Sequence, residues 1–437
     1  MKYLFISILL ILGFSCQENS SNKKNASLLV NAPYPHLVDL TSGMANDNAQ
    51  FFLSDIADSI SFILLEKTDQ TILADVSDAY VDVNNLFIQT SRGQESSYYF
   101  RFDMDGRFRN TIGTVGRGPG EYTASSFNID YDNKSVIVLA YYSTKEFLRF
   151  SYDGRFIEKL PIRKQQDVIR FECLPGGRIV TEPSSTGIVA RLPHYFSAFE
   201  LYNSKGSLID SMPHPALALA GKPESMKYST SLTKGIYKYG DEAFLQLTDE
   251  DTIYITKGDR FEPAFILNKG KYSPSIEARY KAGNKSKLPF LMDFACPGLL
   301  VTGTHLYKRQ ILNDHKYLFE YNIETGNIRS SVTHATRESS YGFYEFEDEV
   351  GFIDDLSASG QKLFFSNLTG KNGSVWISWL SATNFRNRFG NDKIIDGLKY
   401  NAKIRDQRLQ LINRIEDDDN PVVILIYLKG TNMINQL

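Results

Sequence analysis

The sequence contains few residues of the types that most often carry metal or thiol chemistry. Its 437 residues include three cysteines and six histidines. The histidines show no His-Glu-x-x-His or paired spacing, and no Gly-x-Ser-x-Gly motif accompanies them; they are His36, His194, His214, His305, His315 and His334. Motifs therefore predict no catalytic residue, no metal ligand and no cofactor, and the sequence favours a protein that is not an enzyme.

An excess of charge of either sign is also missing. The chain has 48 Lys and Arg against 51 Asp and Glu, a formal net charge of −3. Nucleic-acid binding needs a basic face, so we expect no nucleic-acid partner. The acidic runs Asp249–Asp251 and Glu416–Asp419 lack the Asp-x-Asp-x-Asp-Gly spacing of a calcium loop, and we predict solvated loops there.

Long apolar runs are missing except at the start of the chain. Lys2 precedes the apolar run Tyr3–Phe14, which is shorter than the roughly 20 residues of a membrane span and predicts a signal peptide at 1–15. The run ends at Gly13-Phe14-Ser15-Cys16, which resembles the bacterial lipobox. That resemblance implies cleavage before Cys16 and a lipid on the Cys16 thiol. The alternative is an ordinary secretory signal in which Cys16 is incidental.

Residues 16–35 are predicted to be the lipidated cysteine followed by a tether. Gln17–Asn25 is polar and without apolar residues, as in a flexible linker. We therefore expect an outer-membrane lipoprotein of the cell envelope, held to the membrane through its N-terminal lipid only. We expect the body, 36–437, to be monomeric.

What the sequence does contain is a repeated, aromatic-rich hairpin. In Tyr98–Phe108, two β-favouring stretches are joined by Asp105-Gly106, a strong turn signal because glycine accepts positive φ. The segment Phe147–Phe156 repeats the pattern 48 positions later, with Asp153-Gly154 at its turn. Weaker copies are Phe199–Leu208, Ile253–Gly258 and Phe319–Ile328.

A second strand–turn–strand pattern precedes each hairpin, as in Val81–Ile88 and Ile129–Leu139. Four strands per unit at a period near fifty are typical of propeller blades, which must stack because one blade cannot bury both of its faces. We predict an all-β, six-bladed β-propeller of four-stranded antiparallel blades. An ordinary β-sandwich with chance similarities between hairpins is the alternative.

The repeat also predicts blade positions. The first five blades fall near 73–113, 124–162, 168–212, 232–268 and 296–332, and the sixth starts near Phe352 and takes in 363–365 and 375–379. We expect the last blade to be closed by both termini, with the N-terminal strands at 36–40 and 60–65 joining the run 422–428. Apolar spacing predicts a helix over Lys403–Ile415.

Two cysteines remain in the predicted propeller, Cys173 and Cys296. An oxidising compartment permits a disulfide. However, the two residues belong to the third and fifth units, which are too far apart for the short reach of a disulfide. Two free, buried thiols are favoured.

The stretch Ile112–Tyr122 contains four glycines but no Gly-Lys-Ser/Thr, so it is not a phosphate-binding loop. Its Gly-Arg-Gly-Pro-Gly-Glu-Tyr segment, after the first hairpin, resembles the six-bladed β-propeller lipoproteins of Gram-negative, Bacteroides-type bacteria, relatives of NHL and TolB-like propellers. Gly351–Asp355 and Asn420–Leu428 resemble later landmarks of that family. The resemblance implies a six-bladed fold and an export signal, and brings no established reaction or ligand.

Four residues are candidates for ligand binding. Arg117 and Glu121 are the polar members of the glycine-rich motif; they either contact a ligand at the mouth of the channel or form a buried pair that fixes the loop, and the pair is favoured. Asp354 and Asp355 either face the channel or stabilise a turn.

Two functions follow. The first is an envelope-tethered binding protein for a glycan, a peptide or an envelope protein. The second is a lyase or hydrolase with a metal site in its channel. A channel lined by Arg, aromatic and amide groups favours binding, whereas clustered His and Asp side chains favour the enzyme.

Overall fold

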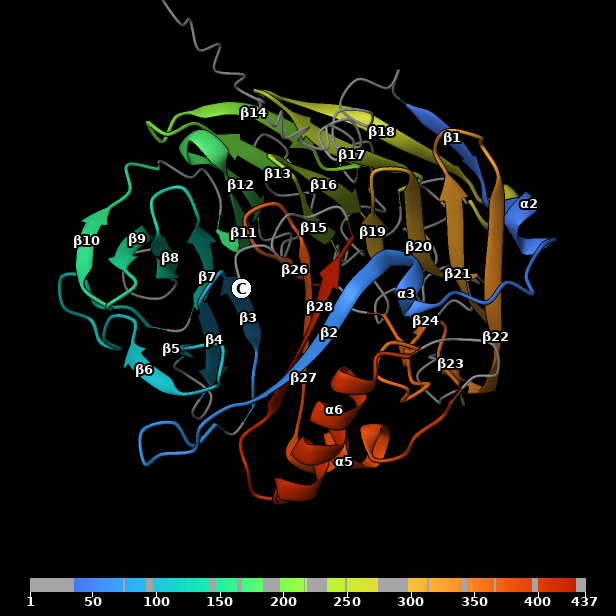
Figure 1. The fold of residues 1–437 in the computed structure, drawn as a ribbon. Coiled ribbons are helices and arrows are strands. Elements are labelled where there is room, and N and C mark those ends of the chain that lie inside the picture. Colours follow the sequence, from blue (N-terminus) through green and yellow to red (C-terminus); the bar gives the residue numbers. More distant parts are fainter. Residues whose placement is uncertain are drawn as a thin grey trace, which may run out of the picture.

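The computed structural model describes residues 35–429 except 74, 92–96, 124, 141–145, 163–166, 184–196, 216, 218–233, 248–249, 274–297, 313, 339–343, 347, 365–366 and 395–399. These residues form six four-stranded antiparallel blades around a common axis, so the predicted six-bladed β-propeller is confirmed (Figure 1). No helix among the described residues is long and apolar enough to cross a membrane.

The first three blades follow the predicted ranges closely. Blade one contains β3 (Asp78–Asp82), β4 (Asn85–Ser91), β5 (Ser97–Phe102) and β6 (Phe108–Thr111). Blade two contains β7 (Ser125–Asp130), β8 (Ser135–Ala140), β9 (Glu146–Ser151) and β10 (Phe156–Lys159). Blade three contains β11 (Val168–Leu174), β12 (Arg178–Pro183), β13 (Ser197–Tyr202) and β14 (Leu208–Pro213).

The next two blades each carry a fifth strand. Blade four contains β15 (Lys234–Tyr239), β16 (Glu242–Leu247), β17 (Thr252–Lys257) and β18 (Arg260–Asn268), with β1 (His36–Asp39) on its outer edge. Blade five contains β19 (Leu299–Val301), β20 (His305–Leu312), β21 (His315–Asn322) and β22 (Ile328–Glu338), with β23 (Tyr344–Phe346) beyond them. Blade five therefore runs past its predicted end.

Blade six combines a strand from the N-terminal part of the chain with strands from its C-terminal part. It contains β26 (Asn367–Thr369), β27 (Val375–Leu380), β28 (Val422–Leu428) and β2 (Ala57–Leu64). The N-terminal strand β2 is the outermost and pairs antiparallel with β28, with Ile60 opposite Ile426. The predicted closure by both termini is confirmed, and each end holds the other in the sheet.

One N-terminal strand lies elsewhere than predicted. β1 pairs in parallel with β18, with His36 opposite Phe265, so its partner is blade four rather than the last blade. The chain then forms α2 (Leu40–Met44) against blade five, where Gly43 approaches Phe319, and α3 (Leu53–Ile56) before it enters β2. The segment reaches three blades because a short strand pairs with whichever sheet edge is open beside it.

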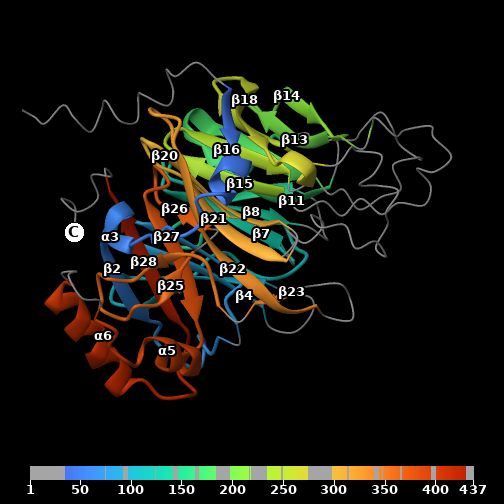
Figure 2. The ribbon, with the colours of Figure 1, turned by 90° about the vertical axis from the view of Figure 1, so that its right-hand side faces the viewer.

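The predicted start of blade six is also corrected. β24 (Phe352–Ile353) and β25 (Lys362–Leu363) pair with each other as a separate ribbon and take no place in the blade. The predicted helix is confirmed as α6 (Ala402–Arg414), which packs with α5 (Ala382–Phe389) beside β2 at one edge of the ring (Figures 1 and 2). Asn401 caps α6 by accepting from the Ile404 amide.

The glycine of each early Asp-Gly-type turn lies against the preceding blade. Gly106, Gly154 and Gly206 all have positive φ. A Cβ on Gly154 would lie 2.1 Å from the carbonyl oxygen of Thr111, at the end of β6, and one on Gly206 would lie 2.3 Å from that of Pro161, just past β10. Glycine is needed here for both its backbone angle and its lack of a side chain, which explains why the repeat is visible in the sequence.

The core consists of apolar layers between neighbouring blades. Phe87 and Tyr99 of blade one pack with Phe127 and Phe150 of blade two, while Phe147 and Phe171 connect blades two and three. Each layer needs two blades, so the ring is stabilised as a whole.

Candidate functional site

The glycine-rich loop lies between blades one and two and is held by its own glutamate. Glu121 accepts a hydrogen bond from the Gly118 amide at 2.7 Å, and a Cβ on Gly116 would lie 2.0 Å from the same carboxylate. The Arg117 side chain is exposed, and the described residues contain no Arg117–Glu121 ion pair. The favoured buried pair is therefore wrong for Arg117, while Glu121 does fix the loop.

Asp354 is completely buried in the turn between β24 and β25. Its carboxylate accepts from the Ser357 amide at 2.9 Å, from the Ser357 hydroxyl and from the Ser359 hydroxyl at 2.5 Å. Burial raises the pKa of Asp354 above its usual range, and the hydrogen bonds from Ser357 and Ser359 oppose that rise. These bonds stabilise the turn, which is one of the two roles that the sequence left open.

Asp355 bonds in the other direction, to the N-terminal segment. It accepts from the amide of Ser54 at 2.9 Å and from its hydroxyl at 2.5 Å, which ties α3 to the ribbon. Among the described residues, no hydrogen bond or ion pair joins Asp354 or Asp355 to Arg117 or Glu121. The four predicted ligand-binding residues therefore form two separate groups, and their binding role stays a prediction.

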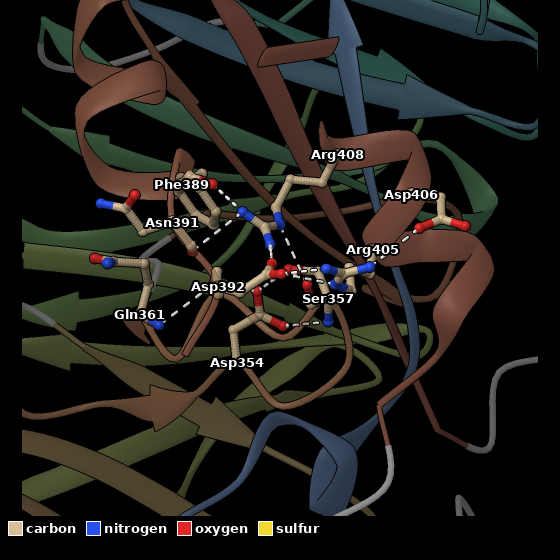
Figure 3. Close-up of polar contacts among 10 residues, drawn as sticks. Asp354, Ser357, Gln361, Phe389, Asn391, Asp392, Arg405, Asp406 and Arg408 are labelled. Carbon is tan, nitrogen blue, oxygen red and sulfur yellow. Dashed lines mark hydrogen bonds and ion pairs between the residues drawn. The ribbon is translucent and has the colours of Figure 1, made fainter. Parts of the chain in front are cut away.

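A fully buried arginine explains how the helices attach near Asp354. Arg408 donates to the carbonyls of Ser357 (3.1 Å), Phe389 and Asn391 (3.3 Å), and it forms an ion pair with Asp392 (Figure 3). A guanidinium removed from water needs such partners on several sides. This network holds α5, α6 and the 354–361 turn together and is structural.

A second polar group gathers at the axis of the ring, on the innermost strands of blades one to four. We call it the axial cluster; its members are Asp78, Tyr80, Asn128, Arg170, Glu172 and Lys238. These innermost strands, β3, β7, β11 and β15, face the middle of the ring in Figure 1. The cluster has a buried half and a half that solvent reaches.

The buried half is the ion pair of Lys238 and Glu172, and each of the two charged groups has a further hydrogen-bond partner. Lys238 donates to the Glu172 carboxylate at 3.1 Å and to the Cys173 carbonyl at 2.9 Å, and its ammonium lies 4.7 Å from the centre of the Tyr131 ring. Asn128 donates to the other Glu172 oxygen at 2.9 Å. Two charges buried together persist only with such pairing, so this half connects blades two, three and four.

The solvent-reached half consists of Asp78, Tyr80 and Arg170. Solvent reaches the Arg170 side chain, and groups of three blades act on its charge: Glu182 of its own blade, Asp78 and Tyr80 of blade one, and Tyr237 of blade four. Burial works against the charge of Arg170, but Glu182 and Asp78 still raise its pKa. Burial raises the pKa of Asp78 to about 6, and Arg170 opposes that rise.

Hydrogen bonds connect blade six with blades one, two and four at one end of the axis. It is the end at which the inner strands β3, β7 and β15 finish. The hydroxyl of Thr369 in blade six accepts from the Val81 amide at 2.9 Å and lies 3.0 Å from the Tyr131 hydroxyl. The Gly240 amide donates to the Asn372 carbonyl at 3.1 Å. Asp78 lies about 10 Å from this end, because it is three positions before Val81 in β3.

Comparison with protein families identifies the chain at the level of its fold. A model described as "Domain of unknown function (DUF4934)" matches residues 36–427. The chain belongs to the DUF4934 family. No curated protein matches it.

Solved structures resemble this DUF4934 chain as propellers. BF0058 of Bacteroides fragilis, whose name describes it as a candidate exported protein, is 18% identical, covers 91% of this chain and 100% of its own, and gives a TM-score of 0.56. Virginiamycin B lyase of Staphylococcus aureus is 10% identical over 62% of this chain and 73% of its own, with a TM-score of 0.34. The likeness to BF0058 shows the fold alone.

Sequence reasoning missed the axial cluster of this DUF4934 chain. Its members lie on separate strands with no shared motif, and Arg170 sits in a short strand that reads as an ordinary blade element. The one available signal was a charged or amide residue at an inner-strand position of four successive units.

The acidic, histidine and cysteine side chains of the described residues do not form a metal site. No group of three His, Cys, Asp or Glu side chains in the described part of the chain has the arrangement to hold a metal ion. Cys173 is buried and free, and burial raises the pKa of its thiol. Cys296, Cys16 and His194 lie outside the described residues.

Proposed function

We propose that this protein is a lipoprotein of the cell envelope, anchored through Cys16, that binds a ligand at the solvent-reached half of the axial cluster without chemical turnover. The observation that carries the binding role is the composition of that half. It offers the Arg170 guanidinium, the Asp78 carboxyl group and the Tyr80 ring from two blades, and a few polar groups beside an aromatic ring are typical of binding sites.

The composition also favours binding over the lyase or hydrolase alternative. The groups around Arg170 are tyrosines and carboxylates, with Asn128 nearby, and this is the Arg, aromatic and amide lining expected of a binding channel. The ligand classes stay those predicted from the sequence: a glycan, a peptide or an envelope protein. Export agrees with the name of BF0058, and the lipid anchor is supported by the Gly-Phe-Ser-Cys segment.

Thermal-shift screening of the purified protein against glycans and peptides tests the binding role. We expect a ligand that raises the melting temperature of the wild type and has at least tenfold weaker affinity for Arg170→Gln. Arg117→Ala serves as the matched control, because it removes an exposed arginine outside the cluster. A ligand that Arg170→Gln and Asp78→Asn bind as well as the wild type does would contradict the proposal.

Asp78 adds a pH dependence. Its folded pKa lies above its unfolded value, so the stability it contributes is present at low pH and is lost as pH rises from about 4 to above 6. Relative to wild type, Asp78→Asn should therefore gain stability between pH 4.5 and 7.5. A constant difference in melting temperature across that range would argue against a raised pKa.

The anchor is tested separately. Cys16→Ala should convert a protein that partitions into detergent into one that stays in the aqueous phase or keeps its signal peptide. Unchanged partitioning of the variant would exclude the lipid and leave the binding role untouched.

A further inference from the structure

A cleft of about 310 Å³ lies between blades two and three, away from the solvent-reached half of the axial cluster. Its apolar side includes Ile137, Leu160 and Ile179. Asp130 and Arg149 line it with a partly buried ion pair of 2.6 Å. A small volume with an apolar side and a few placed polar groups matches the general form of a ligand pocket.

The repeat explains why this cleft exists. We call the junction of blades one and two the closed seam, and that of blades two and three the open seam. Aligned on Gly154 and Gly206, Tyr152 of blade two corresponds to Ser204 of blade three. Tyr152 lies in the closed seam, and the exposed Ser204 lines the cleft in the open seam.

A second replacement enlarges the open seam. Phe87 and Ile137 are equivalent, since each pairs across its sheet with an arginine, Arg101 for Phe87 and Arg149 for Ile137. The open seam therefore has an isoleucine where the closed seam has a phenylalanine, and a serine where it has a tyrosine. The two changes remove aromatic volume from the two facing sides of the junction, at the place where the Phe87 and Tyr152 rings meet in the closed seam.

The closed seam shows what fits such a space. The Tyr152 ring lies 4.7 Å from the Phe87 ring, centre to centre, and its hydroxyl donates to the Asp82 carboxylate at 2.8 Å. Asp82 ends β3 as Asp130 ends β7, so the open seam keeps the carboxylate that accepts the phenol in the closed seam. What the open seam lacks is the ring.

We propose that the cleft of the open seam binds a 4-hydroxyphenyl group, presented as a tyrosine side chain of a peptide. The apolar side formed by Ile137 and Leu160 receives the ring, and the Asp130 carboxylate accepts the phenol hydrogen. Asp130 already accepts from Arg149 and Asn133, and a carboxylate has room for about four hydrogen bonds.

The polar groups of the cleft favour a neutral peptide group over an ion. Asp130 and Arg149 neutralise each other, so a charged ligand gains little there. Asn133, Asn203 and Ser204 line the cleft with amide and hydroxyl groups, which can bond the amides on either side of a tyrosine. A saturated sugar matches the apolar side less well than an aromatic ring does.

Saturation-transfer NMR with N-acetyl-tyrosinamide on the full-length protein tests this site. We expect transfer to the aromatic protons of the probe and at least tenfold weaker binding of N-acetyl-leucinamide. Ser204→Tyr copies blade two into blade three and should abolish the transfer. Ser207→Tyr is the matched control, because it adds the same ring to an exposed position of the same turn that does not line the cleft.

Equal transfer to Ser204→Tyr and wild type, or no transfer to wild type, would overturn the proposal. Equal affinity for N-acetyl-phenylalaninamide would overturn the role of Asp130. If Ser204→Tyr fails to fold, the thiol of Cys173 gives a second readout, because Cys173 also lines the cleft. In a Cys16→Ala, Cys296→Ser protein, the tyrosine probe should slow labelling of Cys173 severalfold, and an unchanged rate would contradict binding.

Discussion

Two junctions of the same ring, built from the same repeat, differ in how they are filled. In the closed seam, Tyr122 from the glycine-rich loop and Tyr152 from the blade-two turn complete an apolar layer that contains Phe87. In the open seam, the layer around Phe171 has fewer aromatic residues, and a cleft remains beside Ile137. Repetition therefore fixes where the blades meet, while single side chains decide whether a junction is core or pocket.

The early part of the linking segment is the same in both seams. The Ile112 amide donates to the Tyr99 carbonyl at 2.8 Å, and the Leu160 amide donates to the Phe147 carbonyl at the same distance, 48 positions later. After this shared hydrogen bond, the chain at the closed seam continues into the glycine-rich loop. The loop is thus an addition to a shared framework, in which Glu121 holds the backbone and the Arg117 side chain is exposed.

The largest expected loss of stability comes from removing the Tyr122 ring from the closed seam. Tyr122 is fully buried, and its hydroxyl donates to the Ile112 carbonyl at 2.7 Å. Tyr122→Ala should lower the free energy of unfolding by about 3–5 kcal/mol in urea titrations, because it leaves a cavity between two blades. Tyr122→Phe removes only the hydrogen bond and should cost about 1 kcal/mol. Equal losses for the two variants would show that the ring does not fill the seam.

The turn glycines should matter equally in both seams. Gly154→Ala and Gly206→Ala each place a methyl group against a carbonyl oxygen of the preceding blade and force positive φ on alanine. We expect losses of about 2–4 kcal/mol for each. Gly240→Ala is the control: its φ is +57°, but nothing lies within 4 Å of the added Cβ, so it should cost about 1 kcal/mol. A similar loss at all three positions would assign the effect to backbone angle alone.

These positions also mark what the sequence can predict. The turn glycines reveal the blades because the preceding blade leaves no room for a side chain at Gly106, Gly154 or Gly206. The residue that the packing requires is therefore also the one that makes the repeat visible in the sequence. The helix near 403–415 is likewise visible, since Ile404 and Leu411 are both buried and lie seven positions, about two helical turns, apart.

Other features depend on contacts between distant segments. The parallel pairing of β1 with β18 joins His36 to Phe265, and nothing in four residues of strand specifies that partner. The axial cluster brings Asp78 and Arg170 together only once the ring closes. Blade three has Ser204 where blade two has Tyr152, which in the sequence looks like ordinary variation within a turn. Its effect on packing becomes visible only when the two seams are compared.

The comparison is tested directly by converting the closed seam into an open one. Tyr152→Ser gives blade two the serine of blade three and should cost about 2 kcal/mol, since the half-buried ring and its bond to Asp82 are lost. The variant should also gain a second site for N-acetyl-tyrosinamide, seen as a doubled stoichiometry at saturating probe. Tyr152→Phe keeps the ring and should show neither the large loss nor the added site. Loss of stability without added binding would separate the packing role of the ring from the proposed recognition.

The smallest effects distinguish the two polar residues of the glycine-rich motif. Glu121→Ala removes the acceptor of the Gly118 amide and should cost about 1–2 kcal/mol, because a charge-assisted hydrogen bond is lost from a tight loop. Arg117→Ala should change the free energy of unfolding by less than about 0.5 kcal/mol, since its side chain is exposed. Parallel urea titrations of the two variants measure the difference. A larger loss of unfolding free energy for Arg117→Ala than for Glu121→Ala would contradict this expectation. It would mean that Arg117 has a stabilising partner in the protein, in addition to the contacts of Glu121 and Tyr122 in the closed seam.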